Sequence, residues 1–322
     1  MRRGLVIGKF LPIHQGHLAL IHFAASQCDE VIVSMSYGTN DAIDGELRFS
    51  WIKEIFEGHP RVKPEIIKDD FDNDLLPLAE RTKIWAERMQ KVYPPVNYVF
   101  SSEEYGLPFA EHMNAGHRNF DPERKQVPVS ATLIRNHPFK YWEYIPEVVR
   151  PFFVKKICFY GPESTGKSTI AKRMAELYQT EFVPEVAREL ITSNDFTVKD
   201  ILRIGHAQTK RVIDKTKIAN KILFCDTDII TTQIYSEYYL NTIPPELYEL
   251  EEVVKYDQYF LFDIDVEWVQ DGLRDLGDRR REMYEVFKDK LDRRSISYLK
   301  VNGNYEEREN YIRSVIDKML DS

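Results

Sequence analysis

Residues 161–168 carry the clearest chemical signal in the sequence. They run Gly-Pro-Glu-Ser-Thr-Gly-Lys-Ser, which fits the pattern G-x-x-x-x-G-K-[ST] between an expected strand and an expected helix. In such a loop, backbone N–H groups hold phosphate oxygens, the Lys167 ammonium neutralises the outer phosphates, and the Ser168 hydroxyl can ligate Mg²⁺. We predict a nucleotide phosphate site formed by Gly161, Glu163, Ser164, Thr165, Gly166, Lys167, Ser168 and Thr169.

Carboxylates follow two apolar segments downstream of this loop. The apolar run 222–225 is followed by Asp226 and Asp228. Either aspartate could help to hold Mg²⁺, although aspartates also form turns at strand ends. We assign the catalytic and metal-binding role to Asp226. Glu185 follows a short strand-like segment and could orient or deprotonate an acceptor hydroxyl, while an acid that merely favours a helix start is the alternative.

A basic segment, residues 271–281, stands out in an otherwise acidic chain. It contains Arg274 and the run 279–281, cations of the kind that cover a transferring phosphate. A solvated helix face is the alternative for any one of these arginines. We expect the charge-rich part, 275–281, to be a mobile loop.

A second phosphate site is predicted near the N-terminus. The segment 8–17 reads Gly-Lys-Phe-Leu-Pro-Ile-His-Gln-Gly-His, and its two histidines lie three apart where a strand turns into a helix, so that both rings can face one anion. Ser130, Thr132 and Arg135 stand at another expected helix start. A zinc pair is the alternative, but no Cys or Glu at metal spacing completes it. We predict a triphosphate cradle of Lys9, His14, His17 and Arg135.

These residues must be positioned by alternating strands and helices. Strands are expected at 4–8, 31–35, 96–101 and 156–160, and helices at 17–25, 48–56, 78–93 and 167–178. This alternation indicates parallel sheets flanked by helices, and its restart near residue 156 indicates two α/β domains in tandem, 1–153 and 154–322. The segment 136–153, with three prolines beside several aromatics, is expected to be a packed terminal extension of the first domain.

Composition limits the class of protein. The 322 residues are 43% hydrophobic and 30% charged, with a net charge of −8, which indicates a folded protein and argues against broad adhesion to nucleic acid or to an anionic membrane. Three cysteines, an odd number without metal spacing, argue against a disulfide framework. No signal peptide or long apolar stretch is visible, so we expect a soluble cytoplasmic protein without stable membrane association.

The histidine segment and residues 130–135, Ser-Ala-Thr-Leu-Ile-Arg, together resemble the HxGH and ISTTxxR motifs of the HxGH nucleotidyltransferases. Followed by a P-loop kinase unit, the whole chain resembles the NadR family of bifunctional nicotinamide mononucleotide adenylyltransferases and ribosylnicotinamide kinases. The resemblance implies a Rossmann-like nucleotidyltransferase domain and a P-loop kinase domain, with ATP and Mg²⁺ required. The C-terminal domain would phosphorylate nicotinamide riboside, and the N-terminal domain would adenylylate the resulting mononucleotide to give NAD and pyrophosphate.

The resemblance also implies site roles and partners. By match to the family motifs, ATP phosphates would be bound by Gly8, Lys9, Phe10, His14, His17, Ser130, Thr132 and Arg135. Residues 101–106 would lie near the adenosine and 38–41 near the acceptor. Only small molecules are expected as partners, with a homo-oligomer allowed. Some family members carry a DNA-binding helix-turn-helix before the first strand; here that strand starts at Gly4, so no DNA-linked regulation is expected.

The two chemistries need different residues. A nucleotide phosphate is already anionic near neutral pH, so adenylyl transfer needs positioning and charge stabilisation more than a base. Phosphorylation of a ribose hydroxyl releases a proton, which is why an acid such as Glu185 or Asp226 is sought in the second domain. The alternatives are a phosphopantetheine adenylyltransferase joined to a dephospho-coenzyme A kinase, and a nucleotide sensor with one inactive domain.

Overall fold

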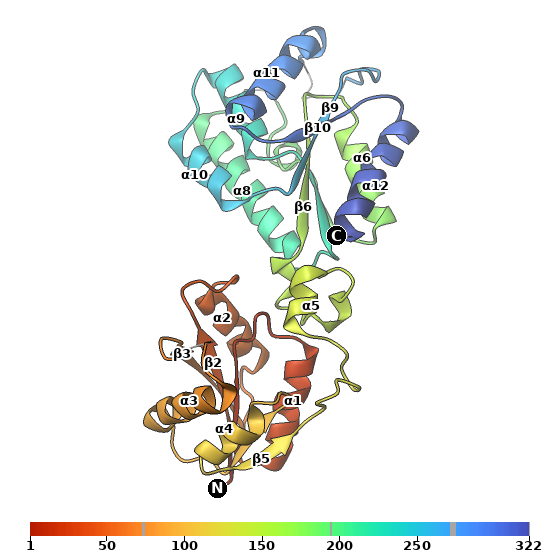
Figure 1. The fold of residues 1–322 in the computed structure, drawn as a ribbon. Helices are drawn as coiled ribbons and strands as arrows, with labels where there is room; N and C mark the ends of the chain where they lie inside the picture. Colours follow the sequence, from red (N-terminus) through yellow and green to blue (C-terminus); the bar gives the residue numbers. More distant parts are fainter. Residues whose placement is uncertain (73–74, 194, 271–274, 322) are drawn as a thin grey trace. The chain divides into compact units, whose positions relative to one another are not determined.

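The computed structural model describes residues 1–322 except 73–74, 194, 271–274 and 322. The chain divides into two compact units, Met1–Arg150 and Pro151–Ser322 (Figure 1). Each unit contains one five-stranded sheet. Both are described separately below.

The first unit alternates strands and helices from its first residues. Its strands are β1 (Arg3–Gly8), β2 (Glu30–Tyr37), β3 (Val62–Lys68), β4 (Tyr98–Ser101) and β5 (Gly116–Asn119). Its helices are α1 (Gln15–Gln27), α2 (Gly45–Ile55), α3 (Leu78–Val92), α4 (Gly106–His112), α5 (Ala131–Asn136) and the 3₁₀ turn η1 (Trp142–Tyr144).

The sheet of the first unit has the order β3-β2-β1-β4-β5, with every strand pair parallel. The chain therefore adds β2 and β3 on one side of the central strand β1, and then β4 and β5 on its other side. In open parallel sheets this change of direction leaves a crevice beyond the carboxyl end of the central strands, where ligands bind. The residues that follow β1, beginning with Lys9, enter this crevice.

The core of the first unit explains why these segments fold as they do. On one face of the sheet, Leu5 and Ile32 pack with Met89 of α3 and Phe109 of α4. The segment that follows α5 is also well packed, because the side chains of Phe139, Trp142, Ile145 and Val149 are all buried. The expected packed extension is therefore confirmed for residues 139–149, since a flexible linker would expose these apolar groups to water. Phe152 is 47% exposed and residues 151–153 belong to the second unit, so the first unit ends at Arg150 and not at 153.

The second unit repeats the alternation. Its strands are β6 (Lys155–Tyr160), β7 (Phe182–Val183), β8 (Ile222–Asp226), β9 (Gln258–Phe262) and β10 (Tyr298–Val301). Its α-helices are α6 (Lys167–Leu177), α7 (Ala187–Leu190), α8 (Val198–Thr216), α9 (Ile229–Leu240), α10 (Pro245–Val253), α11 (Arg280–Arg293) and α12 (Tyr305–Asp321), with 3₁₀ turns η2 (Arg150–Phe152) and η3 (Gly277–Arg279).

The second sheet has the order β10-β9-β6-β8-β7 and is parallel throughout the described pairs. Strand β6 is central and buried on both faces. Ile157 and Phe159 pack against α6 and α12, whereas Cys158 and Tyr160 pack against α9 and α11, because alternate residues of a strand point to opposite faces. Both units thus have the α/β architecture with parallel sheets that the sequence predicts.

One expectation about the chain is overturned by this architecture. The charge-rich stretch 275–281, expected to be a mobile loop, is largely helical: it contains the 3₁₀ turn Gly277–Arg279 and the start of α11. Packing explains the difference, because Leu276 and Met283 are buried and anchor both ends of the stretch. None of the helices among the described residues is long and apolar enough to span a bilayer.

Candidate active sites

His14 and His17 lie at the start of α1, where each ring accepts a backbone N–H and the two rings contact each other. The Nδ1 atom of His14 accepts the backbone N–H of Gly16 at 3.1 Å, and Nδ1 of His17 accepts the backbone N–H of His14 at 3.3 Å. The imidazole rings stack, with centroids 3.7 Å apart. An Nδ1 that accepts a hydrogen bond carries no proton, so each neutral ring carries its proton on Nε2.

Both histidines are held neutral. Burial, with Arg124 nearby, lowers the pKa of His14 to about 3. Burial, the neighbouring His14 and Arg124 also hold the pKa of His17 well below its usual range. The pair therefore presents two neutral N–H donors, which can bind phosphate oxygens without first losing or gaining a proton.

These donors line a cavity of about 280 Å³ at the carboxyl end of β1, which we call the transferase phosphate cavity. Ser130 and Thr132 line it as well; the Ser130 hydroxyl also accepts the Leu133 N–H at 3.2 Å and so begins α5. The remaining lining residues are Val6, Ile7, Gly8, Phe10, Gly16, Leu20, Ser102, Glu103, Tyr105, Phe120, Asp121, Arg124, Val127, Val129 and Ala131. The segment 101–106, expected near adenosine, thus contributes to the same cavity.

Two of the predicted cations lie elsewhere. The Arg135 guanidinium donates to the backbone oxygen of Leu11 and to Thr132 Oγ1, so it braces the turn before α1, and it does not line the cavity. Lys9 points to a neighbouring cavity and lies 3.8 Å from the Asp69 carboxylate. The predicted cradle of four basic side chains is therefore only half assembled, by the two histidines.

Arg124 is the cation that sequence reasoning missed. It stands at φ 51° in a tight loop that Asp121 organises by accepting the N–H groups of Lys125, Gln126 and Val127 at 2.8–3.1 Å. Its guanidinium pairs with Glu103 at 2.6 Å beside the phosphate cavity. The one signal for this loop in the sequence is the turn-forming pair Asp121-Pro122, which does not reveal where the loop lies.

A second cavity of about 190 Å³ shares Ile7, Gly8 and Tyr105 with the first. We call it the transferase acceptor cavity. Its other lining residues are Lys9, Ser34, Ser36, Asp69, Phe71, Asp72, Arg81, Trp85 and Met89. The Trp85 indole N–H donates to Asp72 at 2.8 Å, which fixes a large aromatic surface beside two carboxylates.

The second unit holds its phosphate loop between β6 and α6. Gly161 has φ 137° and a Cβ there would lie 2.9 Å from the backbone oxygen of Phe262, so only glycine fits. Lys167 Nζ donates to the backbone oxygens of Gly161 and Pro162, at 2.9 and 2.8 Å. From α12, the fully buried Arg308 donates to Thr165 O at 2.5 Å and to Gly303 O at 2.8 Å. The loop is therefore fixed from the far end of the sequence.

This loop borders a cavity of about 210 Å³, the kinase phosphate cavity. Every predicted phosphate-loop residue lines it; the full lining is Gly161, Glu163, Ser164, Thr165, Gly166, Lys167, Ser168, Thr169, Glu185, Arg188, Thr227, Thr231, Tyr235, Glu267, Val269 and Tyr305. A smaller cavity of about 70 Å³, the kinase acceptor cavity, continues from it. The two share Glu163, Glu185, Arg188, Thr227, Thr231 and Tyr235.

Asp226 and Ser168 form the candidate metal position. The Ser168 hydroxyl donates to Asp226 Oδ2, and Asp226 Oδ1 is buried with no hydrogen-bond partner among the described residues. Burial, partly offset by Lys167, raises the pKa of Asp226 to about 6. One hydroxyl and one carboxylate with a vacant oxygen suit Mg²⁺, which takes few protein ligands beside phosphates and water. No cluster of three or more His, Cys, Asp or Glu that could hold a metal occurs in the described part of the chain.

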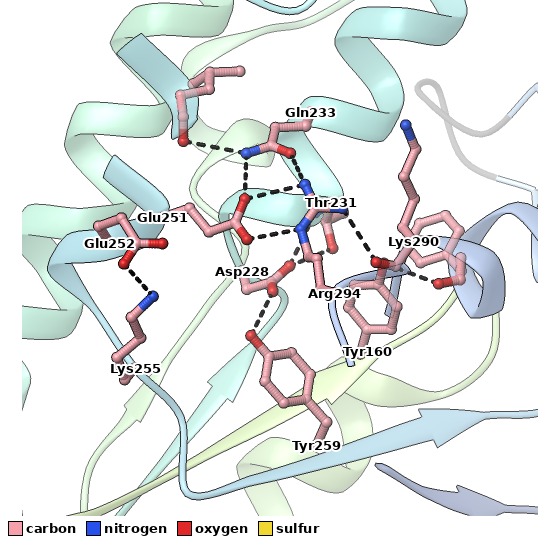
Figure 2. Close-up of polar contacts among 12 residues, drawn as sticks. Tyr160, Asp228, Thr231, Gln233, Glu251, Glu252, Lys255, Tyr259, Lys290 and Arg294 are labelled. Atoms are coloured by element: carbon pink, nitrogen blue, oxygen red, sulfur yellow. Dashed lines mark hydrogen bonds and ion pairs between the residues drawn. The ribbon is translucent and has the colours of Figure 1, made fainter. Parts of the chain in front are cut away.

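Asp228 has a different role, shown in Figure 2. Its Oδ1 accepts the N–H and hydroxyl of Thr231 at 2.9 and 3.0 Å and so begins α9, while its Oδ2 accepts the Tyr259 hydroxyl at 2.9 Å. Both carboxylate oxygens are occupied within the fold. Of the two aspartates at the end of β8, only Asp226 retains a vacant oxygen.

Glu185 stands where the two kinase cavities meet, with its carboxylate 2.9 Å from the Arg188 guanidinium. The basic segment is arranged differently from our expectation. Arg279 pairs with Glu282, and Arg280 donates to Ser164 O at 3.1 Å, so that Arg280 supports the phosphate loop through its backbone. The run 279–281 lines neither kinase cavity. Arg274 lies outside the described residues.

Comparison with known proteins agrees with this architecture. Residues 156–308 match the family model "AAA domain". The "Trifunctional NAD biosynthesis/regulator protein NadR" of Escherichia coli (strain K12) is 31% identical over 95% of this chain and 80% of its own length. The chain belongs to the NadR family.

Solved NadR structures have the same fold. A crystal structure of NadR protein in complex with NAD and AMP-PNP superposes with a TM-score of 0.80 at 23% identity, covering 100% of this chain and 96% of the other. A second, in complex with NR, has a TM-score of 0.78 at 24% identity and covers 98% and 95%. The NadR architecture therefore extends over both units.

Proposed function

We propose that this member of the NadR family makes NAD from nicotinamide riboside in two ATP-dependent steps. The second unit phosphorylates the riboside to nicotinamide mononucleotide, and the first unit joins the mononucleotide to AMP from ATP, releasing pyrophosphate. Membership of the NadR family across both units is the observation that carries this proposal.

In the first unit, adenylyl transfer relies on positioning and neutral donors. The Nε2–H groups of His14 and His17 would bind phosphate oxygens of ATP, where negative charge moves as pyrophosphate leaves. Arg124 lies beside them and adds a full positive charge. No base is required, because the attacking phosphate of the mononucleotide is already ionised near neutral pH.

The transferase acceptor cavity supports the assignment of the mononucleotide to the other side of β1. Lys9 offers a cation for a phosphate. Asp69 offers negative charge and Trp85 an aromatic surface for a cationic ring, whereas Asp72 is already paired with Arg81 at 2.7 Å. Ile7 and Gly8 line both cavities, so the acceptor phosphate and the ATP phosphates would meet over the end of β1.

In the second unit, phosphoryl transfer requires removal of a proton. Glu185 lies between the phosphate and acceptor cavities and can accept the proton from a ribose hydroxyl. Lys167 and the loop N–H groups would hold the phosphates of ATP. Mg²⁺ held by Ser168 and Asp226 would neutralise charge on those phosphates.

The experiment that tests this proposal supplies Mg-ATP with either nicotinamide riboside or nicotinamide mononucleotide and measures NAD by enzymatic cycling. Wild type should make NAD from both. Lys167→Ala should lose NAD formation from the riboside alone, whereas His17→Ala should lose it from both while still converting riboside to mononucleotide. The exposed residues Lys172 of α6 and His22 of α1 provide matched alanine controls. Equal loss of both steps in Lys167→Ala would contradict the assignment of two separate sites.

A further inference from the structure

Glu163 lines the kinase acceptor cavity, yet the expected phosphoryl transfer gives its carboxylate no role. The wall of this cavity carries two tyrosines of α9, Tyr235 and Tyr239, whose rings are stacked with centroids 6.3 Å apart. Phe196 packs edge-on against Tyr239 at 5.3 Å. The phosphate loop adds a carboxylate to this aromatic cavity, because Glu163 lines both this cavity and the phosphate cavity.

Glu163 differs from Asp275 and Glu185, the two carboxylates that repel it. Glu185 pairs with Arg188, and Asp275 accepts the Tyr239 hydroxyl. Glu163 Oε2 is buried yet has no hydrogen-bond partner in the described part of the chain. The adjacent cation, Lys167, is held by the backbone oxygens of Gly161 and Pro162. A buried carboxylate oxygen without a partner is costly, so retaining one beside an aromatic wall indicates that a ligand completes it.

A positively charged ligand group would stabilise this carboxylate in its ionised form. A pyridine ring glycosylated on nitrogen is a permanent cation with no N–H on that nitrogen, so a direct hydrogen bond cannot recognise the charge. A carboxylate close to the ring and aromatic faces against it are the two groups that can do so. The kinase acceptor cavity combines them: Glu163 supplies the carboxylate, and Tyr235 and Tyr239 supply the faces.

We infer that Glu163, although part of the phosphate loop, determines acceptor specificity by recognising the positive charge of the pyridinium ring and so selects cationic over neutral nucleosides. This inference rests on the proposed riboside kinase activity. It separates Glu163 from its neighbours in the loop, whose N–H groups and side chains face the phosphates of ATP.

The ionisation of Glu163 agrees with this role. Burial and repulsion from Asp275 and Glu185 raise the pKa of Glu163 to about 7. The charged and titratable groups around it are Asp275, Glu185, Tyr235, Tyr239, Lys167 and Arg188. A bound pyridinium stabilises the ionised carboxylate, so wild type should release a fraction of a proton on binding the riboside near pH 7. Calorimetric titration in two buffers of different ionisation enthalpy measures this release.

The decisive experiment compares nicotinamide riboside with benzamide riboside, a neutral carbon analogue with the same carboxamide and ribose. The full-length protein is assayed for kcat/KM with each nucleoside and Mg-ATP. Wild type should prefer the cation by at least about tenfold. Glu163→Gln, which keeps the shape and removes the charge, should lose that preference mainly through the riboside, while Glu163→Asp should retain part of it.

The possible outcomes separate this inference from the proposed function. An equal loss for both nucleosides in Glu163→Gln would overturn the inference, because it would mean that Glu163 contacts the ribose or supports the phosphate loop. Absence of any preference in wild type would overturn it as well. Failure of wild type to phosphorylate either nucleoside would instead contradict the riboside kinase activity. If Glu163→Gln misfolds, Glu163→Asp and the proton release of wild type still decide the question.

Discussion

The Nδ1 atom of His17 accepts the backbone N–H of His14, and this one contact fixes which nitrogen of His17 faces the phosphate cavity as a donor. His14 is fixed in the same way by Gly16. The fold therefore sets the tautomers of both rings before any nucleotide binds. Preorganised neutral donors stabilise developing charge without reorganising during the reaction.

This arrangement predicts different outcomes for two amide substitutions of His17. In His17→Gln the amide nitrogen can occupy the position of Nε2 and still donate to phosphate, whereas in His17→Asn the shorter amide replaces only Nδ1. Adenylyl transfer should fall by about 10²–10³ in His17→Asn and by clearly less in His17→Gln. Steady-state rates with nicotinamide mononucleotide measure the difference; indistinguishable losses would mean that ring charge, and not Nε2–H donation, matters.

Stability of the first unit should fall in acid because the fold keeps both His14 and His17 neutral. The pKa of His14 is about 3 in the folded protein against 6.5 in the unfolded chain. Below pH 6.5 the unfolded chain therefore binds a proton that the folded protein does not, and unfolding becomes easier. Between pH 7 and 5 this costs about 2 kcal/mol in the free energy of unfolding.

The matched control is His14→Asn, because asparagine still caps α1 and does not titrate. Three of the four tryptophans lie in the first unit, so fluorescence in a Trp268→Phe background reports urea unfolding of that unit alone. Wild type should lose about 2 kcal/mol more than His14→Asn between pH 7 and 5. The same pH dependence in both proteins would show that His14 is not the group responsible.

Substitutions of Asp226 and Asp228, which are two residues apart, should have different effects: the first on kinase activity and the second on stability. Asp226→Asn should reduce riboside phosphorylation at least about a hundredfold with little effect on stability. Asp228→Ala should destabilise the second unit by about 2–4 kcal/mol, because α9 loses its cap and Tyr259 loses its acceptor. Kinase assays combined with urea unfolding distinguish these results; a stable, fully active Asp228→Ala protein would disprove the structural role.

Arg124 should act on ATP and not on folding. Arg124→Ala should raise the KM for ATP in adenylyl transfer by about tenfold or more, since a charge-assisted contact to phosphate is lost. Its exposed ion pair with Glu103 should contribute less than about 1 kcal/mol to stability. Glu103→Gln breaks the same pair but keeps the cation, so its KM for ATP should not rise. Equal increases in both variants would implicate the pair itself.

Local patterns predicted most of the fold. Apolar runs such as 4–8 and 156–160 became central strands, and the loop 161–168 with its helix formed as expected, because these features depend on neighbouring residues. Short edge strands such as β5 and β10 were missed, since pairing with β4 and β9 defines them more than their own composition. The helical fate of 275–281 was missed because it depends on burial of Leu276 and Met283.

In the candidate sites too, residues placed by local spacing were predicted, and residues placed by distant partners were not. His14, His17 and the phosphate loop follow from spacing, which fixes where side chains lie on one helix turn. The positions of Lys9 and Arg135 depend on distant partners, Asp69 and the backbone of Leu11, and the sequence offers no sign of those pairings. Arg124 escaped notice for the same reason: its loop reaches the cavity only through the folding of residues far apart in the sequence.

The contact between Arg308 and the phosphate loop has a genetic consequence. The loop directly follows β6, yet its Thr165 carbonyl is held by a side chain 143 residues later. A stop codon between those for Val301 and Arg308 would remove α12 and this brace but leave every residue of the first unit in the product. Late nonsense and frameshift alleles should therefore yield cells that still use nicotinamide mononucleotide but no longer use the riboside.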